Sequence, residues 1–88
     1  VGPIWRGGQH DEDALLASCY RASCELARDH ADIRSIVFPC ISTGVFGFPP
    51  DRAARIAVDA SAPFASDLEL TFCCFSPESA ELYRRLLV

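Results

Sequence analysis

Two short apolar runs, residues 35–41 and 68–75, constrain the fold of this 88-residue chain more than any other feature. The first is continuous rather than an alternation of polar and apolar residues, a pattern typical of a strand buried on both faces, and the second is interpreted as another buried strand. Between them, Pro49 and Pro50 can open a helix, whose apolar side would be Ala53, Ile56, Ala57 and Ala60. A strand, a helix and a strand in this order predict two parallel strands with a right-handed crossover, and therefore an α/β fold.

Two further helices are predicted on either side of this unit. The first begins at Asp11, the expected cap, and ends near residues 29–31. Its apolar positions form two rows, Leu15, Cys19, Ala22 and Leu26 in one and Leu16, Tyr20, Ser23 and Ala27 in the other. The last helix begins at Ser76-Pro77-Glu78, with Leu82, Tyr83, Leu86 and Leu87 on its apolar side. Residues 1–4 are interpreted as the tail of an extended segment. Because two strands and a stub do not make a viable parallel sheet, we expect part of the domain to lie outside this chain.

The length and charge of the chain limit its partners. At 88 residues it is at most one small domain, and its net charge is −4. All eight basic residues are arginines, and they are scattered, which disfavours a long nucleic acid as a partner. No apolar run approaches the roughly 20 residues of a membrane span, so we expect no membrane partner and a cytoplasmic location. A small anionic ligand is still compatible, because backbone N–H groups can bind it without a cationic surface.

Five cysteines and two histidines are the candidates for metal or redox chemistry. The cysteines show no CxxC spacing, and Cys40, Cys73 and Cys74 lie in apolar runs, where cysteine behaves as a small hydrophobic residue. His10 and His30 are expected to be solvated at the two ends of the first helix. The sequence therefore predicts neither a metal site nor a cofactor, and a cysteine-based redox or metal module is the weakest of three interpretations.

The loop after the first strand is the best candidate for a binding site. In an open parallel sheet, ligands bind outside the carboxyl ends of the strands, where residues 42–48 and Phe75-Ser76 should lie. Gly44 and Gly47 allow the loop backbone to approach a ligand, and its N–H groups together with the next helix N-terminus can form an anion nest. A phosphate would fit there, although such a segment can also be an ordinary turn. It is not a Walker P-loop, since the chain has no lysine.

Several segments resemble the macro domain in order and spacing. They are residues 1–8 (VGPIWRGG), Leu15-Leu16, Cys19-Tyr20 and residues 38–49 (FPCISTGVFGFP). The Trp-Arg-Gly-Gly segment resembles the branch that acts as ADP-ribosyl hydrolase and O-acetyl-ADP-ribose deacetylase. The resemblance implies a three-layer α/β/α fold around a mixed six-stranded sheet. This chain, residues 1–88, would be the C-terminal part of one such domain and supply a strand stub, two buried parallel strands and three helices.

The resemblance also implies roles for individual residues. The loop would wrap a diphosphate through its backbone N–H groups, and the ligand-binding residues would be Ile41, Ser42, Thr43, Gly44, Val45, Phe46 and Gly47. Phe46 would lie against the distal ribose and Phe75 would stack on the adenine. A loop-anchoring side chain is the alternative for Phe46, and a core residue is the alternative for Phe75. Trp5 and Arg6 are interpreted as structural, Trp5 packing against the first helix and Arg6 tying the entry turn.

No catalytic residue is predicted within this chain. The family carries an asparagine at a strand end and a glycine-rich loop with a catalytic aspartate, and the resemblance implies that both lie upstream of Val1. Chemistry on a ribosyl linkage needs a carboxylate or a positioned water, whereas the loop has no ionisable side chain. The first hypothesis is part of a hydrolase whose partner is ADP-ribose or an ADP-ribosylated protein. The alternative is a non-catalytic ADP-ribose reader. In both cases we expect the N-terminal part of the domain to be needed for a stable monomer.

Overall fold

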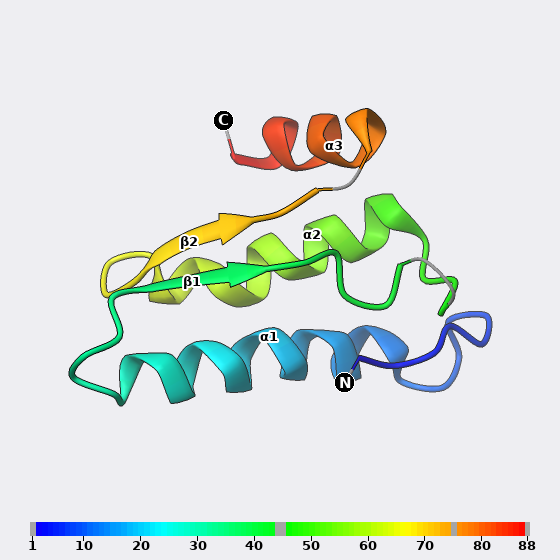
Figure 1. Ribbon diagram of the computed structural model, residues 1–88. Helices are drawn as coiled ribbons and strands as arrows, with labels where there is room; N and C mark the ends of the chain where they lie inside the picture. Colours follow the sequence, from blue (N-terminus) through cyan, green and yellow to red (C-terminus); the bar gives the residue numbers. More distant parts are fainter. Residues whose placement is uncertain (1, 44–45, 75, 88) are drawn as a thin grey trace.

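A computed structural model of the chain describes residues 2–43, 46–74 and 76–87, and these residues form an α/β unit. The elements follow one another in the order that the sequence predicts (Figure 1). They are α1 (Glu12–Arg28), β1 (Ser35–Phe38), α2 (Pro50–Ser61), the short 3-10 helix η1 (Ala62–Phe64), β2 (Glu69–Phe72) and α3 (Pro77–Leu87).

The two strands are parallel, as the strand–helix–strand order predicts. Their register pairs Ser35 with Glu69 and Phe38 with Phe72. Each strand has four residues, shorter than the apolar run that predicted it. Pro39 follows β1 directly and has no N–H to donate, which is consistent with the end of the regular ladder at this point. One further hydrogen bond, from the N–H of Cys73 to the carbonyl of Phe38 (2.7 Å), keeps the ends of the strands together.

All three helices lie against one face of this pair of strands. Figure 1 shows the strands in front of α2, with α1 along one side and α3 along the other. Phe38 faces the helices and is 4% exposed, whereas its neighbour Val37 points away and is 63% exposed. The expectation of strands buried on both faces is therefore wrong for this chain: an apolar run does not reveal which segments are present to cover each face. Within the described residues there are two layers rather than the three that the resemblance implies.

The start of the chain is not a strand in the structure. Residues 2–4 have no assigned strand, so the expected strand stub is absent from the described part of the chain. The segment instead runs beside the loop between β1 and α2, where the N–H of Trp5 donates to the carbonyl of Phe46 (2.8 Å).

Helix α1 begins differently from the prediction. Asp11 lies at its start with a left-handed backbone (φ 61°), and its side chain makes no capping hydrogen bond, so its predicted role as a cap is wrong. Of the two apolar rows predicted along the helix, the row with Leu16, Tyr20 and Ala27 is mostly buried, whereas the other row is mostly exposed. The buried positions are Glu12, Leu16, Tyr20, Cys24 and Ala27, while Leu15 and Leu26 of the other row are exposed. Because only one side of α1 meets the rest of the described chain, the buried stripe is narrower than the sequence indicates.

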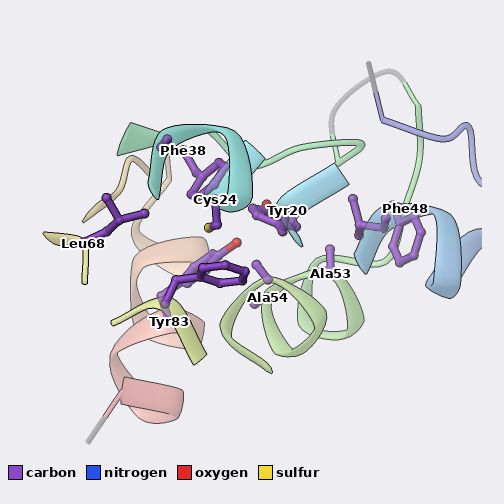
Figure 2. Close-up of a cluster of buried hydrophobic side chains, with 12 residues drawn as sticks. Tyr20, Cys24, Phe38, Phe48, Ala53, Ala54, Leu68 and Tyr83 are labelled. Atoms are coloured by element: carbon purple, nitrogen blue, oxygen red, sulfur yellow. The ribbon is translucent and has the colours of Figure 1, made fainter. Parts of the chain in front are cut away.

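An aromatic core joins the two strands to the three α-helices. Tyr20 of α1 lies edge-on to Phe38 of β1, with ring centroids 4.8 Å apart, and Phe72 of β2 stacks on Tyr83 of α3 at 4.8 Å. Figure 2 shows Ala53 and Ala54 of α2 close to the rings of Tyr20 and Tyr83, with Phe48 at one end of the cluster. The small alanine side chains are consistent with the close packing of α2 against α1 and α3. The core therefore fixes the carboxyl ends of both strands at one level.

The predicted start of α3 is confirmed. The Ser76 hydroxyl accepts a hydrogen bond from the N–H of Ser79 (3.1 Å), and Pro77 is the first residue of the helix. Tyr83 is buried on its apolar side, while Leu87 is exposed. Across the residues that the structure describes, no helix has the length and apolar character needed to cross a membrane.

Candidate functional site

The candidate site is the β1–α2 loop, residues 39–49, at the carboxyl end of the sheet. Five of its predicted ligand-binding residues are described: Ile41, Ser42, Thr43, Phe46 and Gly47. Gly44, Val45 and Phe75 lie outside the described residues, so the roles assigned to them stay predictions. The predicted position of the loop, between a strand end and the start of a helix, is confirmed.

Tyr20 of α1 fixes the beginning of the loop. Its hydroxyl donates to the carbonyl of Pro39 at 3.5 Å. Burial raises the pKa of Tyr20, while hydrogen bonds from Tyr83 and from the backbone of Ile41 act against this increase. A chain of hydroxyl contacts therefore runs from α3 through α1 to the loop. Because Tyr20 belongs to the aromatic core, this hydrogen bond fixes the beginning of the loop relative to the core.

Ser42 occupies an unfavourable position at the centre of the described part of the loop. Its backbone is left-handed (φ 66°), which is uncommon for a residue other than glycine. Its hydroxyl is buried and has no hydrogen-bond partner within the described residues. Gly2 lies directly against it: a Cβ at Gly2 would collide with the Ser42 Oγ and with Ile41. A buried unsatisfied hydroxyl and a left-handed backbone both oppose stability, and such features concentrate at functional sites.

The second half of the loop is held by two backbone hydrogen bonds, one within the loop and one from Trp5. The N–H of Phe48 donates to the carbonyl of Ser42 (2.9 Å), and Trp5 holds the carbonyl of Phe46 as described above. Gly47 has φ 76°, and a Cβ there would meet no atom within 4 Å. Glycine is therefore suited to the backbone conformation at this position, and the protein leaves the adjacent space empty. Phe46 is half-buried, and its proposed contact with a ribose stays a prediction.

Several backbone donors of the loop are not used by the described part of the protein. The N–H groups of Ser42, Phe46 and Gly47 make no hydrogen bond to another described residue. Helix α2 starts directly after the loop, with Pro50 in its first turn. Such N–H groups next to a helix N-terminus can bind an anion.

A carboxylate that the sequence did not single out organises the entry turn, residues 5–11. Glu12 accepts hydrogen bonds from the N–H groups of Arg6 (2.8 Å), Gly8 (2.8 Å) and His10 (2.6 Å). Burial alone would raise the pKa of Glu12, but hydrogen bonds from backbone N–H groups lower it to about 2. The expectation that the Arg6 side chain ties this turn is wrong, since its backbone N–H does so and its side chain is exposed. Two glycines followed at once by a polar turn and an acid are the only signal that the sequence offered for this role.

Trp5 and Arg52 connect the entry turn to α2. The Trp5 ring packs on Phe48 (centroids 4.9 Å apart), and the Arg52 guanidinium lies 5.2 Å from the centre of the Trp5 ring. The Arg52 Nε also donates to both carboxylate oxygens of Asp13, at 2.8 and 2.9 Å. The predicted structural role of Trp5 therefore has a basis in the structure, although its ring partner is a loop residue rather than a residue of α1.

Among the cysteines, Cys40 lies at the start of the loop, and its thiol donates to the carbonyl of Cys73 (3.7 Å). Cys24 is buried, which raises the pKa of its thiol and disfavours the reactive thiolate. Cys73 is exposed, and Cys40 and Cys74 pack against the core. His10 and His30 are exposed at the two ends of α1, as predicted. In the part of the chain that the structure describes, no three Cys, His, Asp or Glu residues are grouped so that they could hold a metal ion.

Comparison with known families gives a match over most of the chain. The model of the family described as Macro domain matches residues 1–57. The chain belongs to the macro domain family. It is 58% identical over 88 residues to a macro domain-containing protein of Ralstonia nicotianae, covering 99% of this chain and 51% of that protein. It is 47% identical over 91 residues to the O-acetyl-ADP-ribose deacetylase of Salmonella gallinarum, covering 99% of this chain and 50% of that protein. The chain thus spans about half the length of the curated relatives it matches.

Solved structures give the same result for the fold. A variant of the Oceanobacillus iheyensis macrodomain with ADPR has a TM-score of 0.89 and 37% identity, and the match covers 99% of this chain and 48% of that one. The Trypanosoma brucei macrodomain in complex with ADP-ribose has a TM-score of 0.82 and 33% identity, with 100% and 38% covered. The predicted macro-domain fold is therefore confirmed for this macro-domain chain.

Proposed function

We propose that this chain supplies the diphosphate-binding loop of a macro domain that binds ADP-ribose. We further propose that the complete domain hydrolyses ADP-ribosyl linkages on proteins or deacetylates O-acetyl-ADP-ribose. The relatives support this assignment, since one is named as an O-acetyl-ADP-ribose deacetylase and two related structures hold ADP-ribose. Because the chain spans only about half of these relatives, its partners and activity are proposed for the complete domain.

The backbone of the loop is the observation that carries this proposal. Ser42 and Gly47 both have left-handed backbones, at φ 66° and 76°. Turns of this kind direct successive N–H groups toward one concave side, where they attract an anion. The N–H groups of both residues lack a partner among the residues described, and a diphosphate would provide acceptors for them.

The proposed division of labour follows from the side chains available. The loop has no ionisable side chain, so its contribution is to bind and orient the diphosphate rather than to transfer protons. A water molecule would attack the linkage, and the group that activates it would come from outside this chain. Phe75 would stack on the adenine at the end of β2, a role that remains a prediction.

The proposal is tested by replacing one glycine of the loop in the full-length protein. Gly47→Val should raise the Kd for ADP-ribose at least about tenfold in calorimetry, equivalent to about 1.4 kcal/mol. The reason is that a β-branched residue resists a positive φ and fills the empty space beside Gly47. Ala22→Val is the control, because it also introduces a β-branched residue, at an exposed position of α1 that lies outside both the loop and the entry turn. Equal loss of affinity in both variants would contradict the assignment of the loop.

A second measurement separates the enzyme from the reader. The full-length protein should release ADP-ribose from a modified protein or acetate from O-acetyl-ADP-ribose. Tight ADP-ribose binding without either turnover would favour the non-catalytic reader, whereas neither binding nor turnover would contradict the proposed function altogether.

A further inference from the structure

We infer that Glu12, which lies outside the binding loop, is a positioning residue that holds residues 46–48 in their ligand-binding arrangement through Trp5. This inference rests on the proposed function, because residues 46–48 belong to the proposed diphosphate-binding loop. Glu12 touches neither the loop nor, by this proposal, the ligand. Its effect would pass through the entry turn to Trp5 and from Trp5 to the loop.

The first step is that one carboxylate accepts hydrogen bonds from three residues of the entry turn. Glu12 is 2% exposed, and its two oxygens accept the three N–H groups of Arg6, Gly8 and His10. The three donors all precede α1 and lie close together in the chain. Hydrogen bonds to an ionised carboxylate are stronger than those between neutral groups. A single side chain therefore determines the shape of a turn that contains two glycines with positive φ, Gly7 and Gly8.

The second step links this turn to Trp5. Gly8 lies so close to the indole that a Cβ on it would be 2.8 and 3.3 Å from two ring carbons of Trp5. Trp5 also immediately precedes Arg6, whose N–H is bound by Glu12. The Arg52 guanidinium of α2 also lies against this ring, close to Gly8. Any shift of residues 6–8 would therefore move either the backbone or the ring of Trp5.

The third step links Trp5 to the loop at two points. Its N–H donates to the carbonyl of Phe46, and its ring packs against Phe48, which is almost completely buried. Phe48 in turn donates its N–H to the carbonyl of Ser42. The loop segment between these contacts includes Gly47, whose N–H is one of the donors proposed to bind the diphosphate. Its orientation thus depends on residues that Glu12 holds.

A simpler role for Glu12 as a favourable charge at a helix N-terminus does not explain its contacts. Its hydrogen bonds from Arg6, Gly8 and His10 all come from residues before α1 rather than from the helix itself. The neighbouring acids behave differently. Asp11 is exposed and makes no capping hydrogen bond, and Asp13 is bound to Arg52. Asp11 therefore provides a matched control: its side chain carries the same charge at the same helix end, but it makes no capping hydrogen bond.

The experiment compares Glu12→Gln with Asp11→Asn in the full-length protein, at a temperature at which both variants are folded. Each removes one negative charge from the start of α1. Glu12→Gln should raise the Kd for ADP-ribose about tenfold, as expected if the binding-competent loop is populated only about a tenth of the time. It should also change the emission of Trp5, which is identified by subtracting the spectrum of Trp5→Phe. Asp11→Asn should leave both the Kd and the Trp5 emission close to those of the wild type.

Three results would overturn parts of this account, and they are distinguishable. Wild-type affinity and wild-type Trp5 emission in Glu12→Gln would overturn the positioning role. Equal effects in Asp11→Asn would assign the change to charge at the helix end and would also overturn it. If the wild type itself does not bind ADP-ribose, the proposed function fails, and Trp5 emission alone then decides the link from Glu12 to Trp5. Should Glu12→Gln fail to fold, Glu12→Asp, which keeps the charge but is shorter, should give an intermediate Kd; a wild-type Kd would overturn the role.

Discussion

The aromatic core and the binding region of this macro-domain chain are stabilised by different means. In the core, Tyr20, Phe38, Phe72 and Tyr83 pack ring against ring between the sheet and the helices. In the binding region, the shape is set by backbone hydrogen bonds and by unusual backbone angles. All the positive φ values in the described part of the chain lie there, at Gly7, Gly8, Asp11, Ser42 and Gly47. Packing thus provides the stability, while the region proposed to bind the ligand contains the strain.

This contrast has a direct consequence for substitutions. A change in the core, apart from the Tyr20 hydroxyl that contacts the beginning of the loop, should lower stability and affect ligand binding only through unfolding. Removing a contact that holds the entry turn or the loop should alter ligand binding in a protein that is still folded. The substitutions below test whether the two regions can be separated in this way.

Phe38→Ala should have the largest effect on stability. It removes a buried ring that contacts Tyr20 and Phe72, and such a truncation lowers the free energy of unfolding by about 3–5 kcal/mol. Thermal unfolding of the full-length protein measures the loss. Val37→Ala is the control on the opposite face of the same strand, where the side chain is 63% exposed, and it should change stability by less than about 0.5 kcal/mol. A large loss in Val37→Ala would mean that another part of the full-length protein covers this face.

Gly2→Ala should have an intermediate effect, lowering both the stability of the protein and its affinity for ADP-ribose. A Cβ at Gly2 would collide with Ser42 and Ile41, so the first segment of the chain or the loop must move. Such overpacking typically lowers stability by about 1–3 kcal/mol. We expect ADP-ribose binding, measured by calorimetry on folded protein, to weaken as well. Gly7→Ala, which meets no atom within 4 Å, should impair binding less; the opposite order would contradict the close contact between Gly2 and the loop.

Tyr83→Phe should have a smaller effect, confined to stability. It removes one hydroxyl that hydrogen-bonds to Tyr20, which corresponds to about 1 kcal/mol in thermal unfolding. Tyr20→Phe removes the hydroxyl that directly holds the carbonyl of Pro39 at the beginning of the loop. We therefore expect Tyr20→Phe to weaken ADP-ribose binding and Tyr83→Phe to leave it nearly unchanged. Equal Kd values in the two variants would mean that the hydroxyl of Tyr20 does not position the loop.

The effect of pH on Glu12 should appear only under acidic conditions, because its carboxyl group is fully ionised at neutral pH. Hydrogen bonds lower the pKa of Glu12 from its ordinary value of 4.5 to about 2 in the folded protein. Its ionised form therefore stabilises the fold fully above about pH 4.5, and this contribution is lost as the pH falls toward about 2. The other titratable or charged side chains of this region are those of Arg6, His10, Asp11 and Asp13 and, from α2, Arg52.

Urea unfolding between pH 5 and pH 2 provides the measurement for this prediction. The free energy of unfolding should fall more steeply in the wild type than in Glu12→Gln, because the glutamine has no proton to gain. Other carboxyl groups contribute equally to both proteins, so the difference between the two curves isolates Glu12. Parallel curves would show that the carboxylate is no better stabilised in the folded state than in the unfolded one.

The core could be predicted from the sequence because its signals are local and periodic. The apolar runs at residues 35–41 and 68–75 located both strands, and the Ser76-Pro77 pair located the start of α3. The same signals overestimated burial. Val37 and Leu15 are apolar but exposed, since neither residue type nor periodicity tells which other segments are present to cover a face. Strand length was also overestimated, because an apolar run continues through Pro39 although the ladder does not.

The sequence predicted where the candidate site lies but not which contacts hold it in place. The rule that ligands bind at the carboxyl ends of parallel strands located the loop, and the resemblance to a family suggested which of its residues bind. The contacts that hold the loop were missed. Gly2 and Trp5 contact it from elsewhere in the chain, and Glu12 is proposed to act on it through the entry turn. The hydrogen bonds of Glu12 and of Trp5 are made with backbone groups, which every residue has. A sequence pattern carries no information about which backbone group a side chain will meet.

The hydrogen bond from Phe48 to Ser42 has a thermodynamic consequence for any ligand of the loop. It closes the five residues between them into a ring while the protein folds, without help from a ligand. Joining the ends of a chain segment lowers its conformational entropy, and here that loss occurs on folding. A ligand that meets a closed loop orders fewer degrees of freedom, so more of its contact energy appears as affinity. We therefore expect this loop to bind a diphosphate with a smaller unfavourable entropy than an open segment of the same length would.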